Sequence, residues 1–314
     1  MRYIEDLRDN ESVEEHYHCK YKQSLKTKTG KAYLSLKLSD KTGVIDAKVW
    51  DMSKDVYAFE EGDIVKVVGE VQVYQNEKQI KVAKIRKSRE GEYVTTHYIA
   101  STDKDVNVLY KSICDLVQSI ENLHIRQLVE TILIKDIEKA NAFRTHCAAK
   151  YMHHSYMGGL LEHTLAVTQI CDFLSTRYKH VNRDILIATA LLHDIGKIYE
   201  LGVMPHNEYT NDGQLLGHII IGLEMITNTI ANIQGFSPEL ASLIKHSIIA
   251  HHGELEFGSP KLPYTAEAYL LHFADNMDAK LKSFEEILDK DNTPGPWAGF
   301  QKALNRHVRS SSYV

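Results

Sequence analysis

The chain has 314 residues, of which 43% are hydrophobic and 25% are charged, and its formal net charge is −5. This composition excludes a disordered chain and suits a globular protein large enough for two domains. Its apolar runs are too short to span a bilayer, its start lacks the order of a signal peptide, and its four cysteines form no Cys-x-x-Cys pair. We therefore expect a cytoplasmic protein with no membrane partner, no disulfide framework and no thiolate zinc site.

The charge is unevenly distributed along the chain. Residues 1–15 carry a net charge of −4, residues 16–90 carry +6, and residues 91–314 carry −7. A basic N-terminal module on an acidic, histidine-rich body suggests that the two parts have different tasks. The basic excess is explained equally well by an ordinary solvated face, so it does not by itself indicate a partner.

From residue 16 to residue 90 the sequence pattern indicates strands. Leu34, Leu36 and Leu38 alternate with polar residues along one predicted strand, as in a half-buried strand. A short helical stretch is expected at 51–59, between the third and fourth strands. The predicted strands lie at 16–27, 32–38, 44–50, 63–74 and 78–87. This order and size resemble the OB-fold, a small Greek-key barrel that often binds single-stranded nucleic acid.

OB barrels hold single strands through aromatic platforms and basic side chains. Tyr33 lies opposite the leucine face and is the best candidate for an exposed stacking residue. Trp50 and Tyr74 either stack on bases or cap the barrel core, and we favour the core for Trp50. The candidate residues for contact with a nucleic acid are therefore Tyr33, Lys37 and Lys48.

After an aperiodic linker, the chain is expected to be helical from Val106 onward. Helices are predicted near 106–120, 124–139, 159–178, 183–200, 214–232, 237–250 and 264–288. The tail looks peripheral, and its Trp297 and Phe300 pack either on the body or on another subunit, so a homo-oligomer is expected. The predicted divisions are an acidic segment (1–15), an OB barrel (16–90), a linker (91–105), a helical domain (106–290) and a tail (291–314). The predicted fold class is α+β multidomain, with a five-stranded OB-like β-barrel followed by an all-α helical bundle.

Histidines and aspartates recur in the apolar helical stretches. A single buried histidine is usually a hydrogen-bonded core residue, but several in similar surroundings are hard to explain separately. Helix bundles build metal sites from inward-facing imidazoles and carboxylates, and this donor set suits Mn, Fe, Co, Ni or Zn. The candidate ligands are His163, His193, Asp194, His218, His251, His252 and Asp275.

His193 and Asp194 are adjacent in the sequence "ALLHDIGK". Neighbouring residues differ by about 100° around a helix, so both reach one centre only from a helix end or with converging rotamers. A carboxylate has two oxygens and can bridge two metals, which an imidazole cannot. A bridging Asp194 would explain one carboxylate among so many imidazoles.

His163, the His193-Asp194 pair and Asp275, in this order on helices, resemble the HD superfamily of metal-dependent phosphohydrolases. The resemblance implies one metal on His163, His193, Asp194 and Asp275, and a second on Asp194, His218, His251 and His252. It also gives Asp194 and Lys197 the catalytic roles, with Lys197 contacting the scissile phosphate or a neighbouring oxygen. The alternative for Lys197 is an ordinary lysine at a helix end. Manganese is the metal that the family resemblance favours.

The OB-like module followed by "AAKYMHHSYMGGLLEHTLAV" and "HDIGK" resembles the YhaM-type 3′→5′ exoribonucleases of Gram-positive bacteria over nearly the whole chain. The resemblance implies removal of nucleoside 5′-monophosphates from single-stranded RNA or DNA by hydroxide activated on two metals. His154 then contacts the substrate phosphate or packs in its loop, and the role of His153 stays open. The Gly-Tyr-Pro element of cyclic-di-GMP phosphodiesterases is missing from the "HHGELEFGSPKLPY" segment.

Two other functions remain open at this point. An HD phosphodiesterase or nucleotidase acting on small nucleotides would use the same chemistry, and only the basic OB-like module speaks against it. Deleting residues 1–95 separates the two, because a polymer nuclease then loses activity on long substrates far more than on a short phosphodiester. A nucleic-acid-binding protein with an inactive HD domain is disfavoured, since no expected ligand position is substituted.

Overall fold

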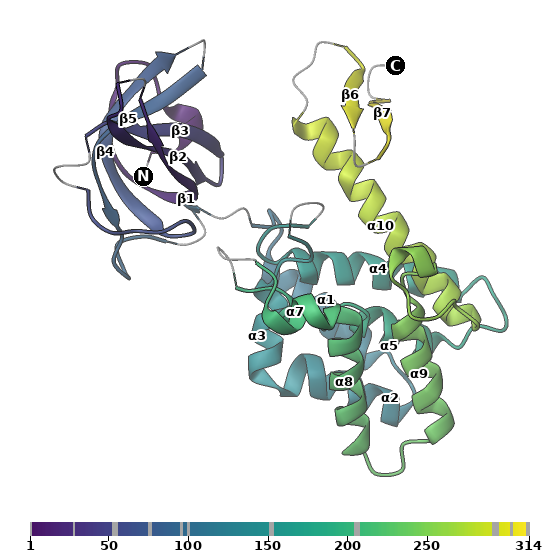
Figure 1. Cartoon of the computed structure of the whole chain (residues 1–314). Coiled ribbons are helices and arrows are strands. Elements are labelled where there is room, and N and C mark those ends of the chain that lie inside the picture. The colour runs from purple at the N-terminus through teal and green to yellow at the C-terminus, as the bar shows by residue number, and fades with distance from the viewer. Residues whose placement is uncertain are drawn as a thin grey trace. The chain divides into compact units, whose positions relative to one another are not determined.

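The computed structural model describes residues 2–27, 29–51, 56–74, 77–94, 97–98, 101–150, 154–203, 208–290, 295–301 and 304–311. The chain divides into two compact units, one made mainly of the residues up to Ser101 and the other mainly of those from Thr102 onward (Figure 1). Among the described residues, no helix combines the length and the apolar character needed to cross a membrane.

The first unit is a closed five-stranded barrel with the strand order β1-β2-β3-β5-β4. Neighbouring strands pair antiparallel, except for β3 and β5, which pair in parallel. Its strands are β1 (Ser12–Lys26), β2 (Ala32–Asp40), β3 (Gly43–Val49), β4 (Ile64–Tyr74) and β5 (Glu77–Lys87). This topology confirms the predicted OB-like barrel.

The alternation seen in the sequence positions the barrel core. Leu34, Leu36 and Leu38 of β2 point inward and are at most 5% exposed. Two more apolar residues of the same core, Ile4 and Leu7, come from the segment expected to be a separate acidic region, and β1 begins four residues before the predicted boundary at 16. The segment was classified by its net charge, which its acidic side chains dominate, so these two apolar core positions were overlooked.

The expected helical stretch at 51–59 falls partly outside the described residues. Within its described part, Val56 forms a parallel bridge with Ile85, and residues 56–59 contain no helix. The chain here adds to the edge of β5 because the backbone of Tyr57 also donates to the carbonyl of Ile85.

Two described parts of the predicted linker, residues 91–105, belong to the folded units. Tyr98 is only 4% exposed, and the carbonyl of His97 accepts a hydrogen bond from the backbone of Lys41 in the barrel. At the other end, the carboxylate of Asp105 caps the first helix by accepting from the amides of Asn107 and Val108. Each of these two parts is therefore folded rather than a free linker.

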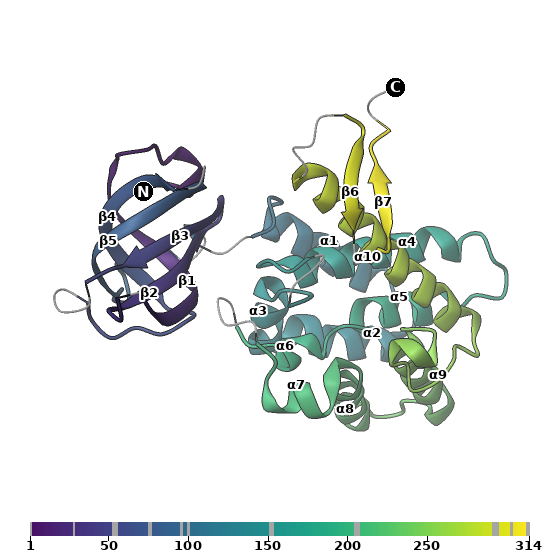
Figure 2. The same cartoon turned by 45° about the horizontal axis from the view of Figure 1, so that its top comes forward.

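The second unit is helical, and its long helices pack side by side (Figure 2). Its elements are α1 (Val106–Gln118), α2 (Leu123–Glu130), η3 (Thr131–Lys135), α3 (Ile137–Thr145), α4 (Gly159–Ser175), α5 (Arg183–Leu192), α6 (Lys197–Glu200), α7 (Asn211–Leu215), α8 (Gly217–Ala231), α9 (Pro238–Ala250), η4 (Leu255–Phe257) and α10 (Ala266–Lys290). Helix α4 packs on α5 and α10, and α5 also packs on α9. The polar cluster described below lies among these four helices and the start of α8.

Besides the helix expected at 214–232, which breaks at Leu216, two of the predicted helices are interrupted. The one expected at 124–139 ends in a π-helical turn, and Asp136 starts α3 by accepting from the amide of Lys139. The one expected at 183–200 breaks after Leu192. This second break has a functional consequence, because His193 and Asp194 lie in it.

The tail forms a hairpin that the sequence did not indicate. Strands β6 (Trp297–Gln301) and β7 (Arg306–Arg309) pair antiparallel, and β7 contacts α10. Ala298 and Val308 are buried, whereas Trp297 and Phe300 are 56% and 53% exposed. The two aromatic residues therefore do not pack on the body.

Candidate metal centre

The predicted ligands come together in one cluster, which we call the His–Asp centre. It consists of His163, His193, Asp194, His218, His251, His252 and Asp275. Three of these residues stand at helix ends: His193 directly follows α5, His251 directly follows α9, and His218 is the second residue of α8. Of the two arrangements considered for the His193-Asp194 pair, the structure shows the helix end.

The glycine of "HDIGK" lets two backbones meet at the centre. A Cβ on Gly196 would lie 2.0 Å from the carbonyl oxygen of His218. The turn that carries Asp194 can therefore approach the start of α8 only if residue 196 has no side chain. This contact brings Asp194 and His218 together.

One half of the centre is built around His163. Its Nε2 lies 3.2 Å from Asp275 Oδ1 and 3.2 Å from His193 Nε2. Asp194 Oδ2 is 3.5 Å from the Nε2 atoms of both His163 and His193. These four residues form the first of the two predicted ligand sets.

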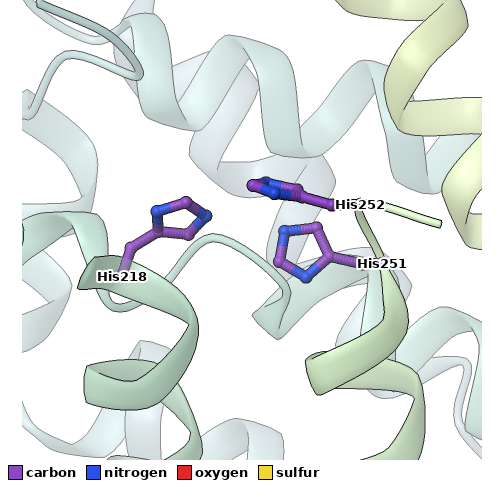
Figure 3. A group of neighbouring side chains, drawn as sticks. All are labelled: His218, His251 and His252. Atoms are coloured by element: carbon purple, nitrogen blue, oxygen red, sulfur yellow. The ribbon is translucent and has the colours of Figure 1, made fainter. Parts of the chain in front are cut away.

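The other half consists of His218, His251 and His252, which point toward one another from α8 and from the end of α9 (Figure 3). One ring nitrogen of each lies within 4.8 Å of those of the other two. Asp194 Oδ1 is 3.5 Å from His218 Nε2 and 3.8 Å from His251 Nε2. The two oxygens of Asp194 thus face different halves of the centre.

Each imidazole of the centre is held through its Nδ1 atom. The acceptors of these contacts are Asp278 for His163 (2.7 Å), the carbonyl of Ala190 for His193 (2.8 Å), Glu200 for His218 (3.0 Å), the carbonyl of Ile248 for His251 (2.7 Å) and the carbonyl of Phe257 for His252 (2.9 Å). A proton on Nδ1 leaves the lone pair on Nε2, and this arrangement is typical of metal-binding histidines. The cluster is therefore organised as a set of five Nε2 donors.

The Nε2 atoms fit a cation better than they fit one another. Those of His218 and His251 are buried and have no hydrogen-bond partner among the described residues. Buried polar atoms without a partner are rare and costly. Those of His163 and His193 face each other at 3.2 Å, a contact that needs a proton on one of the two nitrogens unless a cation lies between them. Divalent metals would satisfy these atoms, so the donor set fits the predicted cofactor.

Burial and neighbouring charges set the protonation of Asp194 and His251. Burial alone would raise the pKa of Asp194, but the Lys197 ammonium and the neighbouring imidazoles outweigh it and hold the pKa well below its usual range. Burial, together with His252, lowers the pKa of His251 well below its usual value. Near neutral pH, Asp194 is thus an anion and His251 is neutral, the forms that bind metals.

Lys197 contacts Asp194 directly, with its Nζ 2.6 Å from Oδ2. Burial disfavours its charged form, but Asp194 outweighs burial and raises the pKa of the ammonium. The lysine also lines an open cavity of about 240 Å³ at the centre. The other lining residues are Ala148, His163, Asp194, His252, Phe257, His272, Asp275, Asn276 and Ala279.

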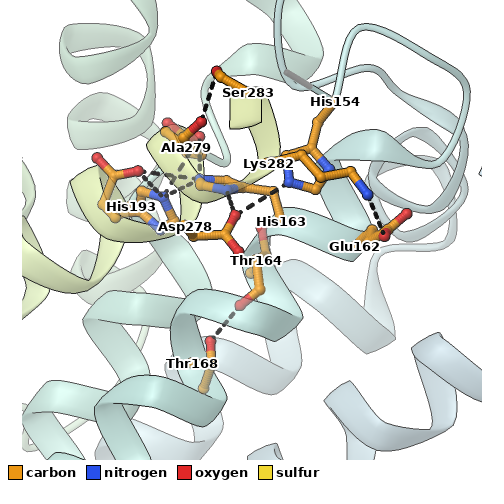
Figure 4. A network of polar contacts seen from close by, with 12 residues as sticks. His154, Glu162, His163, Thr164, Thr168, His193, Asp278, Ala279, Lys282 and Ser283 are labelled. Carbon is orange, nitrogen blue, oxygen red and sulfur yellow. Dashed lines mark hydrogen bonds and ion pairs between the residues drawn. The ribbon is translucent and has the colours of Figure 1, made fainter. Parts of the chain in front are cut away.

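Asp278 is a residue of the centre that sequence reasoning missed. Its Oδ2 accepts hydrogen bonds from His163 Nδ1 at 2.7 Å and from His154 Nε2 at 3.1 Å (Figure 4). Asp278 lies one helical turn after Asp275 on α10. That i,i+3 spacing was the available signal, because it puts both carboxylates on one side of a helix.

The position of His154 bears on its two predicted roles. It was predicted to contact the substrate or to pack in its loop, and it is only 1% exposed. A left-handed backbone (φ 58°) turns its ring inward between Tyr156 and Asp278, which occupy both of its ring nitrogens. These contacts favour the packing alternative, and the substrate contact stays a prediction. His153 lies outside the described residues.

Glu162, beside His163, is a buried carboxylate with several polar partners, and sequence reasoning missed it as well. It accepts hydrogen bonds from Thr102 (2.7 Å) and Tyr156 (3.0 Å) and pairs with Lys104 (2.8 Å). Burial raises the pKa of Glu162, but these donors outweigh it and lower the pKa to about 2. These contacts connect the residues before α1 with the start of α4.

The predicted nucleic-acid residues share the outer face of two barrel strands, the β2–β3 face. Tyr33 stacks on Trp50 with ring centroids 4.6 Å apart. Lys48 donates to Ser35 at 2.6 Å, and Lys37 is exposed on the same side of β2. The predicted core position of Trp50 is wrong: the ring is 39% exposed, because it follows β3 at a position that points outward.

Tyr74, the remaining aromatic candidate, is 63% exposed and ends β4, which pairs with neither β2 nor β3. A basic groove of about 580 Å³ lies elsewhere on the barrel and was not predicted. Its lining is Glu14, Tyr57, Ala58, Lys66, Val68, Lys84, Ile85, Arg86, Lys87 and Arg89. Acidic partners neutralise Lys66, Arg86 and Lys87, so the groove is less cationic than its lining suggests.

The fold and the His–Asp centre define an HD-domain protein that carries an OB-fold. Residues 160–280 match the family model of the HD domain, and residues 21–87 match that of an OB-fold nucleic acid binding domain. The chain is 35% identical to "3'-5' exoribonuclease YhaM" of Geobacillus sp. (strain WCH70) over 83% of this chain and 80% of that protein. It is 34% identical to the protein of the same name from Bacillus subtilis (strain 168), over 83% and 82%. The chain therefore belongs to the YhaM family of HD-domain enzymes, which confirms the resemblance seen in the sequence.

Proposed function

We propose that this protein is a metal-dependent 3′→5′ exoribonuclease that hydrolyses single-stranded RNA to nucleoside 5′-monophosphates. The name shared by its relatives supports the activity and direction, and the OB-fold supports a polymeric nucleic-acid substrate. The observation that carries the proposal is the set of five imidazoles held through Nδ1 with their Nε2 atoms around Asp194.

Two divalent ions, with Mn favoured and Co, Fe, Ni or Zn as alternatives, would be held by the two halves of the centre. Asp194 would contribute one oxygen to each half, since its Oδ2 faces His163 and His193 and its Oδ1 faces His218 and His251. When bound, such ions supply a hydroxide nucleophile at neutral pH and neutralise the charge of a phosphate.

The protein's own groups position the reactants. Lys197 lines the cavity and pairs with Asp194, so its ammonium would lie within reach of a phosphate oxygen bound there. Asp278 and Glu200 fix the ring orientations of His163 and His218. No serine or cysteine nucleophile is needed for this chemistry.

On the barrel, the β2–β3 face would hold upstream nucleotides. The Tyr33–Trp50 pair offers a stacking surface, and Lys37 and Lys48 offer cations for the backbone. Stacking and backbone contacts read little sequence, so weak sequence preference and strong salt dependence are expected. Hydrolysis by activated water does not use the 2′-OH, so single-stranded DNA is a second proposed substrate.

A timed digest of 5′-labelled single-stranded RNA with Mn tests the function. We expect a ladder that shortens from the 3′ end, release of nucleoside 5′-monophosphates, and no reaction in EDTA. Labelled fragments of fixed internal length would indicate an endonuclease instead. Hydrolysis of small nucleotides without digestion of the polymer would favour the nucleotidase alternative.

We also propose that the protein is a cytoplasmic homo-oligomer. The exposed Trp297 and Phe300 of the β6–β7 hairpin support the oligomer, because neighbouring large apolar side chains at a surface can mark a contact between chains. Light scattering of the full chain and of W297S/F300S measures the assembly. A wild-type mass of 35.8 kDa would contradict it.

A further inference from the structure

Phe257 is an exposed aromatic side chain at the cavity of the His–Asp centre. Its ring is 58% exposed, and it lines the cavity together with Lys197, Asp194 and Asp275. An exposed phenylalanine contributes little to the folded core. Beside polar and charged groups that suit a phosphate, it offers a flat apolar surface.

The loop that carries Phe257 is held in place by its backbone. The carbonyl of Phe257 accepts a hydrogen bond from His252 Nδ1 at 2.9 Å, and its amide donates to the carbonyl of Glu254 at 3.0 Å. Gly253 has a φ of 78°, and a Cβ there would lie 2.3 Å from the ring of His272. The backbone of Phe257 is therefore fixed next to a residue of the centre, and its side chain lines the cavity.

We infer that Phe257 is a stacking platform for the base of the 3′-terminal nucleotide. This inference rests on the proposed function, since it assumes that the terminal phosphodiester lies at the centre. The base next to that phosphodiester would then meet the ring of Phe257 while Lys197 and the centre meet the phosphate. Every base has a π-face, so the platform would accept all four nucleotides.

The test compares two 5′-labelled RNA strands of equal length, one with a normal 3′-terminal nucleotide and one with a 3′-terminal abasic ribose. Release of the first residue is measured with enzyme in excess but below saturation. We expect the wild-type enzyme to act about tenfold faster on the normal strand, as base–aromatic stacking implies. In F257A this preference disappears, because the rate on the normal strand falls while the rate on the abasic strand stays within about twofold.

Two matched variants separate stacking from structure. Leu255 lies in the same η4 turn and is 63% exposed, but it is absent from the cavity lining, so L255A should keep the preference. F257W keeps a larger ring and should also keep it. Equal wild-type rates on both strands, or an F257A variant that still prefers the normal strand, would overturn the inference and leave the exoribonuclease proposal intact. A wild-type enzyme that degrades neither strand would instead contradict the proposed function.

Discussion

The His–Asp centre and the β2–β3 face are both sets of polar and aromatic side chains, but they differ in burial. His163, His193 and Asp194 are at most 3% exposed, whereas Trp50 on the barrel is 39% exposed. In the centre, nearly every polar atom depends on a neighbour, since water cannot replace a lost contact. On the barrel, each contact adds a separate increment. Changes in the centre should therefore be large and cooperative, and changes on the barrel small and independent.

Removal of Asp194 should have the largest effect. Asp194→Ala takes one oxygen from each half of the centre, so we expect hydrolysis of RNA to fall on the order of 10³-fold or more. Binding of single-stranded RNA, measured by fluorescence anisotropy, should change by less than about twofold. Hydrolysis that persists in D194A would show that the centre is wrongly assigned.

A substitution of Glu162 tests how much a buried charge beside the centre contributes to the free energy of unfolding. The pKa of Glu162 is lowered from 4.5 to about 2 in the folded state, so its contribution to stability is complete above pH 4.5 and is lost as the pH falls through about 2. Glu162→Gln should lower the free energy of unfolding on the order of 3 kcal/mol at pH 7, and by less at pH 3. Helix loss followed by circular dichroism in EDTA measures both.

A matched control is Glu285→Gln, which removes an exposed partner of Lys282, an ammonium that also pairs with Glu162. Exposed ion pairs contribute about 0–1 kcal/mol, so this change should be nearly silent. Equal effects of the two substitutions would mean that burial does not amplify charge at this site.

Asp278→Asn should weaken metal binding without removing a ligand. The amide still reaches His163 Nδ1 but carries no charge, and such changes behind a ligand typically cost 10- to 100-fold in affinity. Calorimetric titration with Mn measures the loss, and activity should return at higher Mn concentration. Asp289→Asn, on an exposed position of the same helix, should leave the Mn affinity unchanged.

The smallest expected effect is on the barrel. Tyr33→Ala removes one ring of the Tyr33–Trp50 stack, so the Kd for single-stranded RNA should rise about tenfold. Hydrolysis of a dinucleotide should be unchanged. Tyr74→Ala, an exposed tyrosine on a strand outside this face, should raise the Kd by less than about twofold. Equal effects of Y33A and Y74A would remove the reason to single out the β2–β3 face.

Much of the fold could be predicted because its signals are local. The alternation at Leu34, Leu36 and Leu38 indicated the barrel, and polar residues embedded in apolar helices indicated the centre. Trp50 was misjudged although the alternation already indicates its direction: Val49 points inward, so the next residue points outward, where its ring stacks on Tyr33.

The support of the centre could not be predicted, because it depends on tertiary contacts. Asp278 meets His154 and His163 across more than a hundred residues of chain. Glu162 meets Thr102 and Lys104 from the segment expected to be a linker. The i,i+3 spacing from Asp275 is the one local signal for Asp278, and nothing in the local pattern distinguishes Glu162 from a solvated residue.

The most direct test of the proposed two-metal centre joined by Asp194 is the metal content of the full chain after loading with Mn and removal of free ions. The proposal predicts two Mn per chain in the wild-type protein. Exchange coupling between the ions should be visible by electron paramagnetic resonance. In His251→Ala, which removes a donor from one half of the centre, we expect one Mn per chain and no coupling. One Mn in the wild-type protein, or two coupled ions in H251A, would contradict the account.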